Sequence, residues 1–354
     1  MLYRDSGQFK STYEDDRAIF PIAQDRYAML ALLAVAFVAV PILGNDYWLR
    51  SIFTPFLIYS LAAIGLNILT GYAGQVSLGA GGFMAVGAFS VYNLLVRVPE
   101  INFILALVFG GLVAAAVGAL FGIPSLRIKG LYLMVATLAA QFFIEWSFTK
   151  FPWFTNYAPS GVISATPIDM FGWKVEESWE RYVLALAVVT AMALVAKNLV
   201  RGSIGRSWMA IRDMDVAAEI IGIQPMQTKL LAFAVSSFYC GVAGALWAYL
   251  YLGTVEPVAF GINTSFQILF MIIIGGLGSI LGSFLGAGFI ILLPIFINIA
   301  GTGLGLNLST AFISHMEFII FGSLIILFLI VEPHGLARLW QIAKEKLRLW
   351  PFPY

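Results

Sequence analysis

The chain has 354 residues, of which 60% are hydrophobic and only 11% are charged, and its 20 lysines and arginines almost balance its 19 aspartates and glutamates. So large an apolar excess excludes a water-soluble domain of ordinary surface chemistry and predicts a polytopic membrane protein. The near-neutral net charge argues against nucleic acid as a partner. A lone cysteine, Cys240, excludes an intramolecular disulfide and a cysteine-rich metal site.

The polar N-terminal segment, residues 1–26, precedes two apolar runs at residues 27–43 and 51–69. Acidic and basic residues are mixed in this segment, so it lacks the basic start and short apolar core of a cleavable signal peptide. We expect it to remain on the mature protein as a cytoplasmic segment. The first apolar run is at the short end of the roughly 17–25 residues that cross a bilayer, and we expect a transmembrane domain over residues 27–331.

A glycine-rich stretch follows at residues 71–95 and begins GYAGQVSLGAGGF. Glycines permit tight turns and close helix contacts, while Gln75 and Ser77 place polar groups at or near membrane depth. A broken backbone at that depth requires a protein-lined cavity, but glycine-mediated helix packing fits the stretch equally well. We therefore expect either a full span or a re-entrant segment. No Gly-Lys-Ser/Thr follows at the spacing of a phosphate-binding loop, so the chain shows no ATP site of its own.

Two further apolar runs, residues 102–122 and 130–146, flank a basic turn with Arg127 and Lys129, which should face the cytoplasm. Gln141 and Glu145 lie four residues apart and share a face of the second run. Because Glu145 is close to Lys150, we expect an interfacial carboxylate in contact with water.

The segment of residues 150–180 is rich in aromatic residues and ends in glutamates, which is typical of a membrane interface. We place it on the outer side. It is either a docking surface for a soluble binding protein or an ordinary interfacial loop, and the sequence does not separate the two.

A charged loop at residues 201–229 leads into an apolar span. Within it, apolar residues that include Trp208, Ile211 and Ala218 recur at helical spacing, which predicts an amphipathic helix over residues 207–221 that ends at Gly222. We expect this helix to lie flat under the membrane. On composition alone, a solvated loop with a few surface charges fits as well.

The apolar stretch of residues 266–298 exceeds one crossing and is interrupted by glycines, where a re-entrant segment could again replace a full span. Gly278, Gly282 and Gly286 repeat every four residues and predict a helix face without side chains, which a neighbouring helix can approach closely. The last span is expected at residues 311–331.

Near the outer end of this last span, His315 and Glu317 are a weak metal signal. Positions two apart do not share a helix face and no third ligand is nearby, so we expect no metal site. The final segment, residues 332–354, reads as a basic amphipathic tail on the cytoplasmic side. The chain is thus predicted to be an all-α polytopic membrane protein with about ten transmembrane or re-entrant helices and both termini in the cytoplasm.

Three stretches resemble, in the same order, the permease subunits of branched-chain amino-acid ABC importers. They are the G-x-A-G-Q-x-S-L-G run from Gly71, the run GRSWMAIRDMDVAAEIIGIQPMQTK from Gly205 and the G-G-x-G-S-x-x-G run from Gly275. Together they extend from about residue 71 to residue 333 and imply the fold of an ABC importer permease. The family often has His-Ala-Ala-Phe where this chain has AGGF from Ala80, and this departure leaves the substrate open.

The resemblance also implies roles for particular residues. The translocation pathway would be lined by Gly71, Gly74, Gln75, Ser77, Leu78, Gly79 and, on a further helix that resembles the family, Gln141. Coupling to an ATPase would involve Arg206, Ala210, Arg212, Asp213, Ala217, Ala218, Gly222 and Lys229. Helix packing would use Gly275, Gly276, Gly278, Ser279, Gly282 and Gly286.

The family resemblance further implies an assembly in a bacterial inner membrane. In it, the chain would pair with a second permease subunit and two ATP-binding subunits, and would receive branched-chain or related amino acids from an external solute-binding protein. ATP hydrolysis would occur on the partners, so the chain itself is not expected to be an enzyme or to hold a cofactor, and membrane lipid is its other expected contact.

Three alternatives remain. Relatives in the same importer family are associated with urea, short amides or aromatic acids. A stand-alone channel or ion-coupled carrier would predict ionisable residues in mid-membrane, and the sequence offers few. An integral-membrane enzyme would need clustered catalytic side chains, which we do not find.

Overall fold

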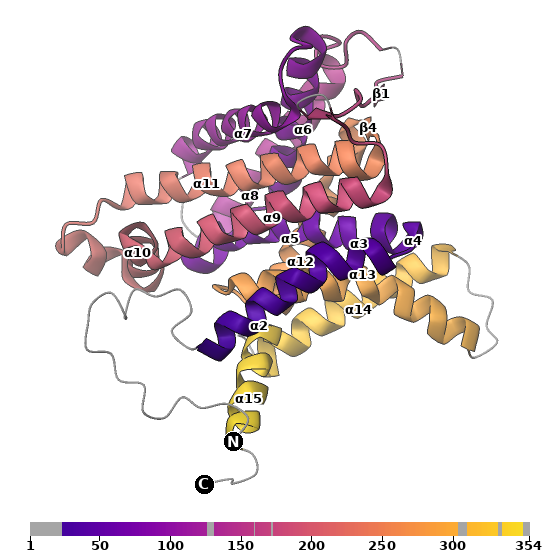
Figure 1. Cartoon of the computed structure of the whole chain (residues 1–354). Coiled ribbons are helices and arrows are strands. Elements are labelled where there is room, and N and C mark those ends of the chain that lie inside the picture. The colour runs from indigo at the N-terminus through magenta and orange to yellow at the C-terminus, as the bar shows by residue number, and fades with distance from the viewer. Residues whose placement is uncertain are drawn as a thin grey trace.

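The computed structural model of the protein describes residues 23–125, 131–158, 160–170, 173–303, 310–331 and 335–349. The residues before position 23, those after α15 and the basic turn at Arg127 and Lys129 lie outside it. The described chain is a bundle of long helices with two very small strand pairs (Figure 1). In Figure 1, α10 lies at one end of the bundle and the strands β1 and β4 lie at the other, and we refer to these as the α10 end and the strand end.

The first two spans are each continuous through short π-helical segments. The first consists of α2 (Ala23–Ala34), η1 (Val35–Ala39) and α3 (Val40–Leu43), and the second of α4 (Asp46–Trp48), η2 (Leu49–Phe53), α5 (Thr54–Asn67) and η3 (Ile68–Tyr72). Both therefore begin earlier than the apolar runs at residues 27–43 and 51–69 predicted, because the helix already includes less apolar residues before each run; the first span ends at Leu43 as predicted, and the second continues to Tyr72.

The middle of the chain supplies most of the bundle. Its helices are α6 (Ala80–Arg97), α7 (Phe103–Ser125), α8 (Leu131–Lys150), α9 (Ser178–Arg201), α10 (Ser203–Ile220) and α11 (Pro225–Leu246), which continues through η4 (Trp247–Leu252). The stretch of residues 71–95 is not one helix. It ends η3, passes through irregular backbone at residues 73–79 and then begins α6.

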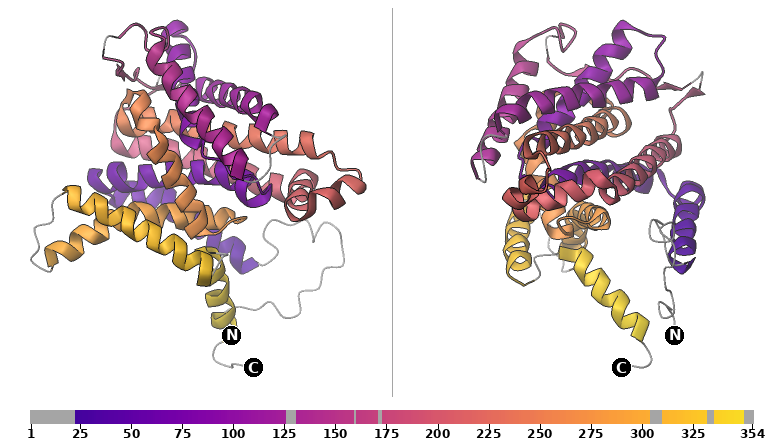
Figure 2. Two further views of the ribbon diagram at one scale, coloured as in Figure 1. Left: turned by 180° about the vertical axis from the view of Figure 1, so that it is seen from behind. Right: turned by 90° about the vertical axis from the view of Figure 1, so that its left-hand side faces the viewer.

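The last third contains a second glycine-rich break, between two candidate spans. A short 3-10 turn, η5 (Pro257–Phe260), precedes α12 (Ile262–Gly275), and the chain then breaks before α13 (Ile280–Gly303). The chain continues with α14 (Thr310–Val331) and α15 (Gly335–Leu349). Figure 2 shows α15 running away from the bundle.

The segment between α8 and α9 is held at the strand end by two antiparallel pairs. Strand β1 (Ile163–Ser164) pairs with β4 (Thr254–Val255), and β2 (Asp169–Met170) pairs with β3 (Trp173–Lys174). The acidic end of the segment has a structural use, because Glu177 and Glu180 form a capping box at the start of α9. The carboxylate of Glu180 also accepts a hydrogen bond of 2.8 Å from the indole of Trp173.

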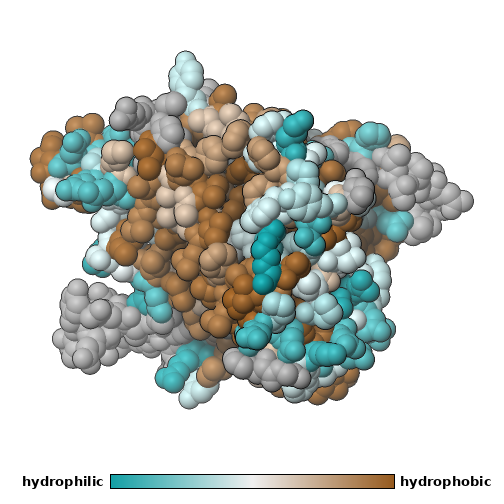
Figure 3. All heavy atoms as spheres, turned by 90° about the horizontal axis from the view of Figure 1, so that it is seen from above, coloured by the Kyte–Doolittle hydropathy of each residue, from teal (hydrophilic) through white to brown (hydrophobic). Residues whose placement is uncertain are grey.

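Eight helices among the described residues are long and apolar enough to cross a membrane. The second span, Asp46–Tyr72, is the centre of the bundle, since 89% of its apolar window is buried, against 0% for the first span, Asp25–Leu43. Large apolar side chains on α7 and α8 are exposed. Figure 3 shows a broad apolar area on one face of the molecule, with hydrophilic residues gathered on either side of it. Such a surface suits acyl chains between two aqueous phases. The predicted class, an all-α polytopic membrane protein, is confirmed.

Candidate functional site

Two breaks between consecutive candidate spans meet at the α10 end of the bundle. Residues 73–79 separate η3 from α6, and residues 276–279 separate α12 from α13. The end of η3, just before the first break, is in direct backbone contact with the second break, because a Cβ atom at Gly71 would overlap the backbone nitrogen of Gly278. Gly276 and Gly278 have φ angles of +123° and +76°, which residues with a side chain rarely adopt. We refer to this contact as the junction.

One buried side chain, Asn67 at the end of α5, holds the junction together. Its Nδ2 atom donates to the carbonyl oxygen of Ser279 and to Oγ of Ser283 at 2.9 Å each, and to the carbonyl oxygen of Gly276 at 3.3 Å. Its Oδ1 atom accepts from the backbone nitrogen of Gly278 at 2.8 Å. A single amide therefore binds backbone groups on both sides of the break between α12 and α13, where the helical hydrogen-bond pattern is interrupted. Sequence analysis missed Asn67, although an asparagine four residues before Gly71 in an otherwise apolar span was a usable signal.

Arg212 connects α10 to the junction. Its Nη1 atom donates to the carbonyl oxygen of Gly71 at 2.9 Å, while its Nε and Nη2 atoms lie 2.9 Å from Oδ1 of Asp213. A Cβ atom at Gly74 would come within 2.9 Å of the Arg212 side chain, so the break before α6 also lies against α10. Residues that the sequence assigned to two separate roles, pathway and coupling, thus form one continuous contact.

Helix α10 is anchored by one face. Trp208 is completely buried, and its indole donates to the carbonyl oxygen of Thr228 at 3.0 Å. The predicted amphipathic helix over residues 207–221 is confirmed, but it begins earlier, at Ser203. The helix is also interrupted at Met214, whose φ and ψ angles are −159° and 93°.

The opposite face of α10 exposes apolar side chains. Met214 is 66% exposed, Ile220 is 82% exposed and Ile221 is 74% exposed. Among the predicted coupling residues, Ala218 is buried, Ala210 and Lys229 are half-buried, and Arg206, Arg212, Asp213, Ala217 and Gly222 are exposed. Lys229 lies 4.0 Å from Asp215, which ties the start of α11 to α10. The predicted set therefore includes both the anchored face and the exposed face.

A second polar cluster surrounds the start of α6. The backbone nitrogen of Leu78 donates to Oγ1 of Thr137 at 2.9 Å, and that of Gly81 donates to Oγ of Ser265 at 2.8 Å. The backbone nitrogen of Gly82 donates to Oε1 of Gln141, which is completely buried. Side chains from α8 and α12 thus satisfy N–H groups that the start of a helix leaves without partners.

Gln141 also joins this cluster to the segment before α12. Its Nε2 atom donates to the carbonyl oxygen of Phe260 at 2.8 Å, and its Oε1 atom accepts from Oγ of Ser265 at 3.2 Å. Gln141 thus contacts Gly82, three residues after the predicted pathway residue Gly79, while Leu78 contacts Thr137 on the same helix as Gln141. Thr137 and Ser265 were not singled out, since a hydroxyl within a span has no distinctive sequence signal.

Gln75 stands apart from both clusters. Its side chain is only 4% exposed, and neither its Oε1 nor its Nε2 atom has a hydrogen-bond partner within the described part of the chain. A buried polar group without a partner costs about 1–3 kcal/mol. Gln75 is therefore the predicted pathway residue whose hydrogen-bonding capacity is not used by the protein in this conformation.

The predicted packing glycines divide into two groups. Gly275, Gly282 and Gly286 bring α12 and α13 together, because a Cβ atom at Gly286 would overlap the carbonyl oxygen of Met271 and one at Gly282 would lie 2.7 Å from that of Gly275. Gly276, Gly278 and Ser279 instead lie in the break. The expectation that Gly278 continues one helix face with Gly282 and Gly286 is wrong, since α13 begins only at Ile280.

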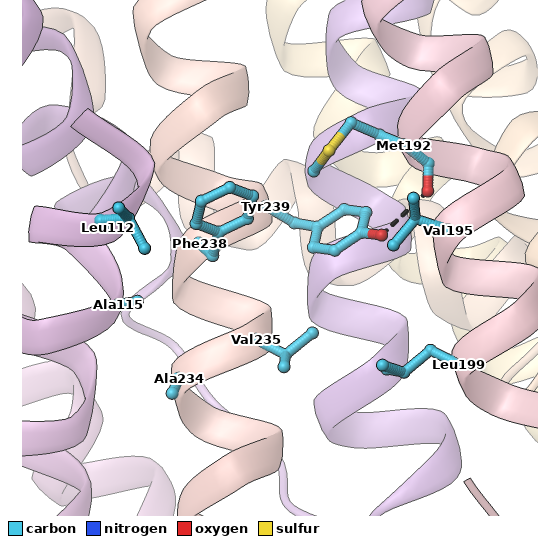
Figure 4. Close-up of a pocket in the computed structure, with 9 residues that line it drawn as sticks. All are labelled: Leu112, Ala115, Met192, Val195, Leu199, Ala234, Val235, Phe238 and Tyr239. Atoms are coloured by element: carbon cyan, nitrogen blue, oxygen red, sulfur yellow. Dashed lines mark hydrogen bonds between the residues drawn. The ribbon is translucent and has the colours of Figure 1, made fainter. Parts of the chain in front are cut away.

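An apolar groove of about 270 Å³ lies between α7, α9 and α11, away from the junction (Figure 4). One phenol reaches its lining, and the hydroxyl group of Tyr239 donates to the carbonyl oxygen of Met192 at 2.8 Å. Such a lining suits hydrocarbon and offers little to a zwitterionic solute. Across the residues that the structure describes, no group of three or more His, Cys, Asp or Glu residues could hold a metal ion.

Comparison with known proteins gives consistent matches. Residues 49–329 match the family described as branched-chain amino acid transport system, permease component. The chain is 31% identical over 274 residues to the high-affinity branched-chain amino acid transport system permease protein LivM of Salmonella typhimurium, which covers 71% of this chain and 63% of that protein. It is 31% identical over 246 residues to LivM of Escherichia coli, with 63% and 57% covered.

A more distant relative is matched over more of its length. The probable branched-chain amino acid transport permease protein LivM of Methanocaldococcus jannaschii is 21% identical over 321 residues, which cover 79% of this chain and 90% of that protein. The chain thus spans less than two thirds of the two bacterial relatives and nearly all of the archaeal one. No solved structure matches the chain.

Proposed function

The chain belongs to the permease family of branched-chain amino acid transport systems, and we propose that it forms half of the translocation pathway of an ATP-driven importer. In this proposal a second, related permease subunit completes the pathway, and two ATP-binding subunits supply the energy. The observation that carries the proposal is the hydrogen bond from Arg212 on α10 to Gly71, because it connects an exposed surface helix to the junction.

We place the ATP-binding subunits against the exposed face of α10. Apolar side chains such as Met214, Ile220 and Ile221 are unusual on a helix that faces water, and a partner's cleft would cover them. Trp208 fixes the other face to the start of α11, so a force on α10 is transmitted to the bundle and not absorbed by a mobile loop.

The junction is where that force would act. Closure of the ATP-binding subunits can drive transport only through contacts that differ between two conformations of the permease. Arg212 contacts the backbone of Gly71 and lies against Gly74, and Asn67 connects the same region to Gly278. A shift of α10 would therefore change the relative position of the two breaks.

Gln75 and the start of α6 are the part of this region that we assign to the solute. The amide of Gln75 has both a donor and an acceptor without partners, which suits a solute with a carboxylate or amide group. The relatives' names favour branched-chain amino acids. Urea, short amides and aromatic acids stay as alternatives, because a separate binding protein would set the selectivity.

We infer that the α10 end faces the cytoplasm and the strand end faces the outside of a bacterial inner membrane. The charged loop with Arg206 and Arg212 lies at the α10 end, as the positive-inside rule requires of a cytoplasmic face. The segment between α8 and α9, pinned to β4 at the strand end, would then be available to an external solute-binding protein.

The proposal is tested first by the subunits that co-purify with the chain and then by the amount of solute taken up per ATP hydrolysed. Affinity purification of the tagged chain from its native membrane should retain an ATPase and a second permease. A chain that purifies alone and transports solute in vesicles without ATP would overturn the importer assignment in favour of a carrier.

In vesicles that contain the purified assembly, we expect Arg212→Ala to lower the amount of solute taken up per ATP hydrolysed by about tenfold or more, since a charged hydrogen bond contributes about 1.5–3 kcal/mol. The matched control is Arg26→Ala, which removes an exposed arginine on α2 and should leave the ratio unchanged. An unchanged ratio in Arg212→Ala would exclude this route of coupling.

A further inference from the structure

Helix α15 has one apolar face and a basic remainder. Leu336, Leu339, Trp340 and Ala343 are spaced so that they share one face of the helix. The helix sequence also contains Arg338, Lys344, Lys346 and Arg348 against one acidic residue, Glu345. This combination is typical of helices that lie in the plane of a membrane surface.

The apolar face extends beyond the protein. Leu336 is half-buried and packs against the hydrophobic core, whereas Leu339 is 45% exposed and Trp340 is 56% exposed. The bundle therefore covers the beginning of the face and leaves its middle uncovered.

The position of α15 is fixed at two points. At its start, Gly335 has a φ angle of +65°, and a Cβ atom there would lie 2.7 Å from the backbone nitrogen of Gly276. Further along, Nζ of Lys344 lies 3.0 Å and 3.1 Å from the two carboxylate oxygens of Asp25, near the start of α2. Figures 1 and 2 show α15 leaving the bundle across the direction of α9 and α11.

These contacts place α15 at a bilayer surface. The apolar helix α14 ends at Val331, a few residues before Gly335, and the candidate span that contains α2 begins beside Lys344. A helix that follows one apolar helix, contacts the start of a candidate span and runs across both lies near the level at which they leave the membrane.

We propose that the exposed face of α15 binds anionic phospholipid, with Leu339 and Trp340 in the acyl-chain boundary and Lys346 at the phosphates. Charge complementarity argues for this occupant, because an excess of lysine and arginine attracts an anionic leaflet. Tryptophan is enriched at the depth of the headgroups, where an apolar ring with one N–H group is suited. The inference depends on the membrane location and not on the ATP-driven role.

Lipid binding would also affect the junction. Gly335 packs on Gly276, whose carbonyl oxygen accepts a hydrogen bond from Asn67. The start of α15 is therefore in contact with the break between α12 and α13. A lipid surface that holds α15 in place therefore restrains the end of α12.

The test measures the depth of a nitroxide label on the full chain in vesicles of phosphatidylcholine with and without phosphatidylglycerol. The label is attached to Trp340→Cys or, as a matched control on the polar face, to Gln341→Cys, which leaves every charge of the helix in place; the natural Cys240 is only 1% exposed. We expect the label at position 340 to be several-fold more accessible to oxygen than to a water-soluble nickel chelate, and the label at position 341 to show the reverse. Equal access to nickel at both positions would mean that the face is in water. Exclusion of both reagents at position 340 would mean that protein covers it, and either result overturns the proposal.

A charge reversal separates anionic lipid from any lipid. We expect phosphatidylglycerol to increase the oxygen accessibility at position 340, and Lys346→Glu to abolish that increase. Lys174→Glu makes the same change on β3, at the strand end, and should preserve it. Two results would overturn the assignment to anionic lipid. One is an oxygen accessibility at position 340 that does not change with phosphatidylglycerol when Lys346 is present, and the other is an increase that persists in Lys346→Glu.

Discussion

Two glycine-rich regions of this bundle use glycine for different reasons. Between α6 and α11, a Cβ atom at Gly87 would overlap the backbone of Gly241, and one at Gly244 would overlap that of Met84, so glycine there permits two intact helices to touch. At the junction, Gly276 and Gly278 have positive φ angles and are bound by Asn67. One region is a static apolar contact, and the other is an interrupted backbone held by polar groups.

This difference separates stability from transport. Damage to the contact between α6 and α11 should lower the free energy of unfolding, because this contact is a close approach of two intact helices. Damage to the junction should disturb the link between α10 and the two breaks before the fold is lost.

The largest effect is expected from Asn67→Ala. It removes the Asn67 side chain that binds the carbonyl oxygen of Gly276 and the backbone nitrogen of Gly278, and a buried group left without a partner costs about 1–3 kcal/mol. We expect uptake by the assembly to be lost and the midpoint of thermal unfolding in detergent to fall.

The matched control is Asn93→Ala, which removes a buried amide bound to the carbonyl oxygens of Phe89 and Phe154, away from the junction. It should lower thermal stability but leave uptake per folded molecule intact. Equal loss of uptake in both variants would show that Asn67 has only a structural role.

A smaller effect, confined to stability, is expected from Gly244→Ala. The new methyl group overlaps the carbonyl oxygen of Met84, and overpacking of this kind costs about 1–3 kcal/mol. Gly322→Ala is the control, because a Cβ atom in that helix would meet nothing within 4 Å. The midpoint of thermal unfolding should fall in Gly244→Ala and stay unchanged in Gly322→Ala. Uptake per folded molecule should stay unchanged in both variants.

The smallest change in stability, with a selective effect on transport, is expected from Gly278→Ala. The nearest atoms to its Cβ would be 3.5 Å away, so the strain comes from the φ angle of +76° and amounts to about 1–2 kcal/mol. Gly161→Ala has nearly the same φ angle, +69°, in the segment between α8 and α9. The two substitutions should lower the midpoint of thermal unfolding by the same amount. Only Gly278→Ala should also lower the amount of solute taken up per ATP hydrolysed. A similar decrease in both would contradict a special role for the junction.

Much of the fold could be predicted from hydropathy. The apolar runs indicated the spans to within a few residues, and the glycine-rich stretches from Gly71 and Gly275 indicated where the spans are interrupted. The spacing of Trp208, Ile211 and Ala218 predicted α10, because its anchored face is apolar while much of the remainder is charged.

The contacts between distant segments could not be predicted in this way. A helix inside a membrane is apolar on every side, so its sequence does not show which face meets which neighbour. That Gly71 lies against Gly278, and that Arg212 reaches both breaks, required the structure. Asn67, Thr137 and Ser265 were missed because each acts through the backbone of a segment far away in the sequence.

The four hydrogen bonds of Asn67 have a consequence for how the junction can move. They share one small amide whose two ends bind both sides of the break between α12 and α13. A displacement that misaligns this amide weakens several bonds at the same time, so partial opening has little advantage over complete opening. Separation of the breaks should therefore be cooperative, with two well-populated states and few intermediates between them.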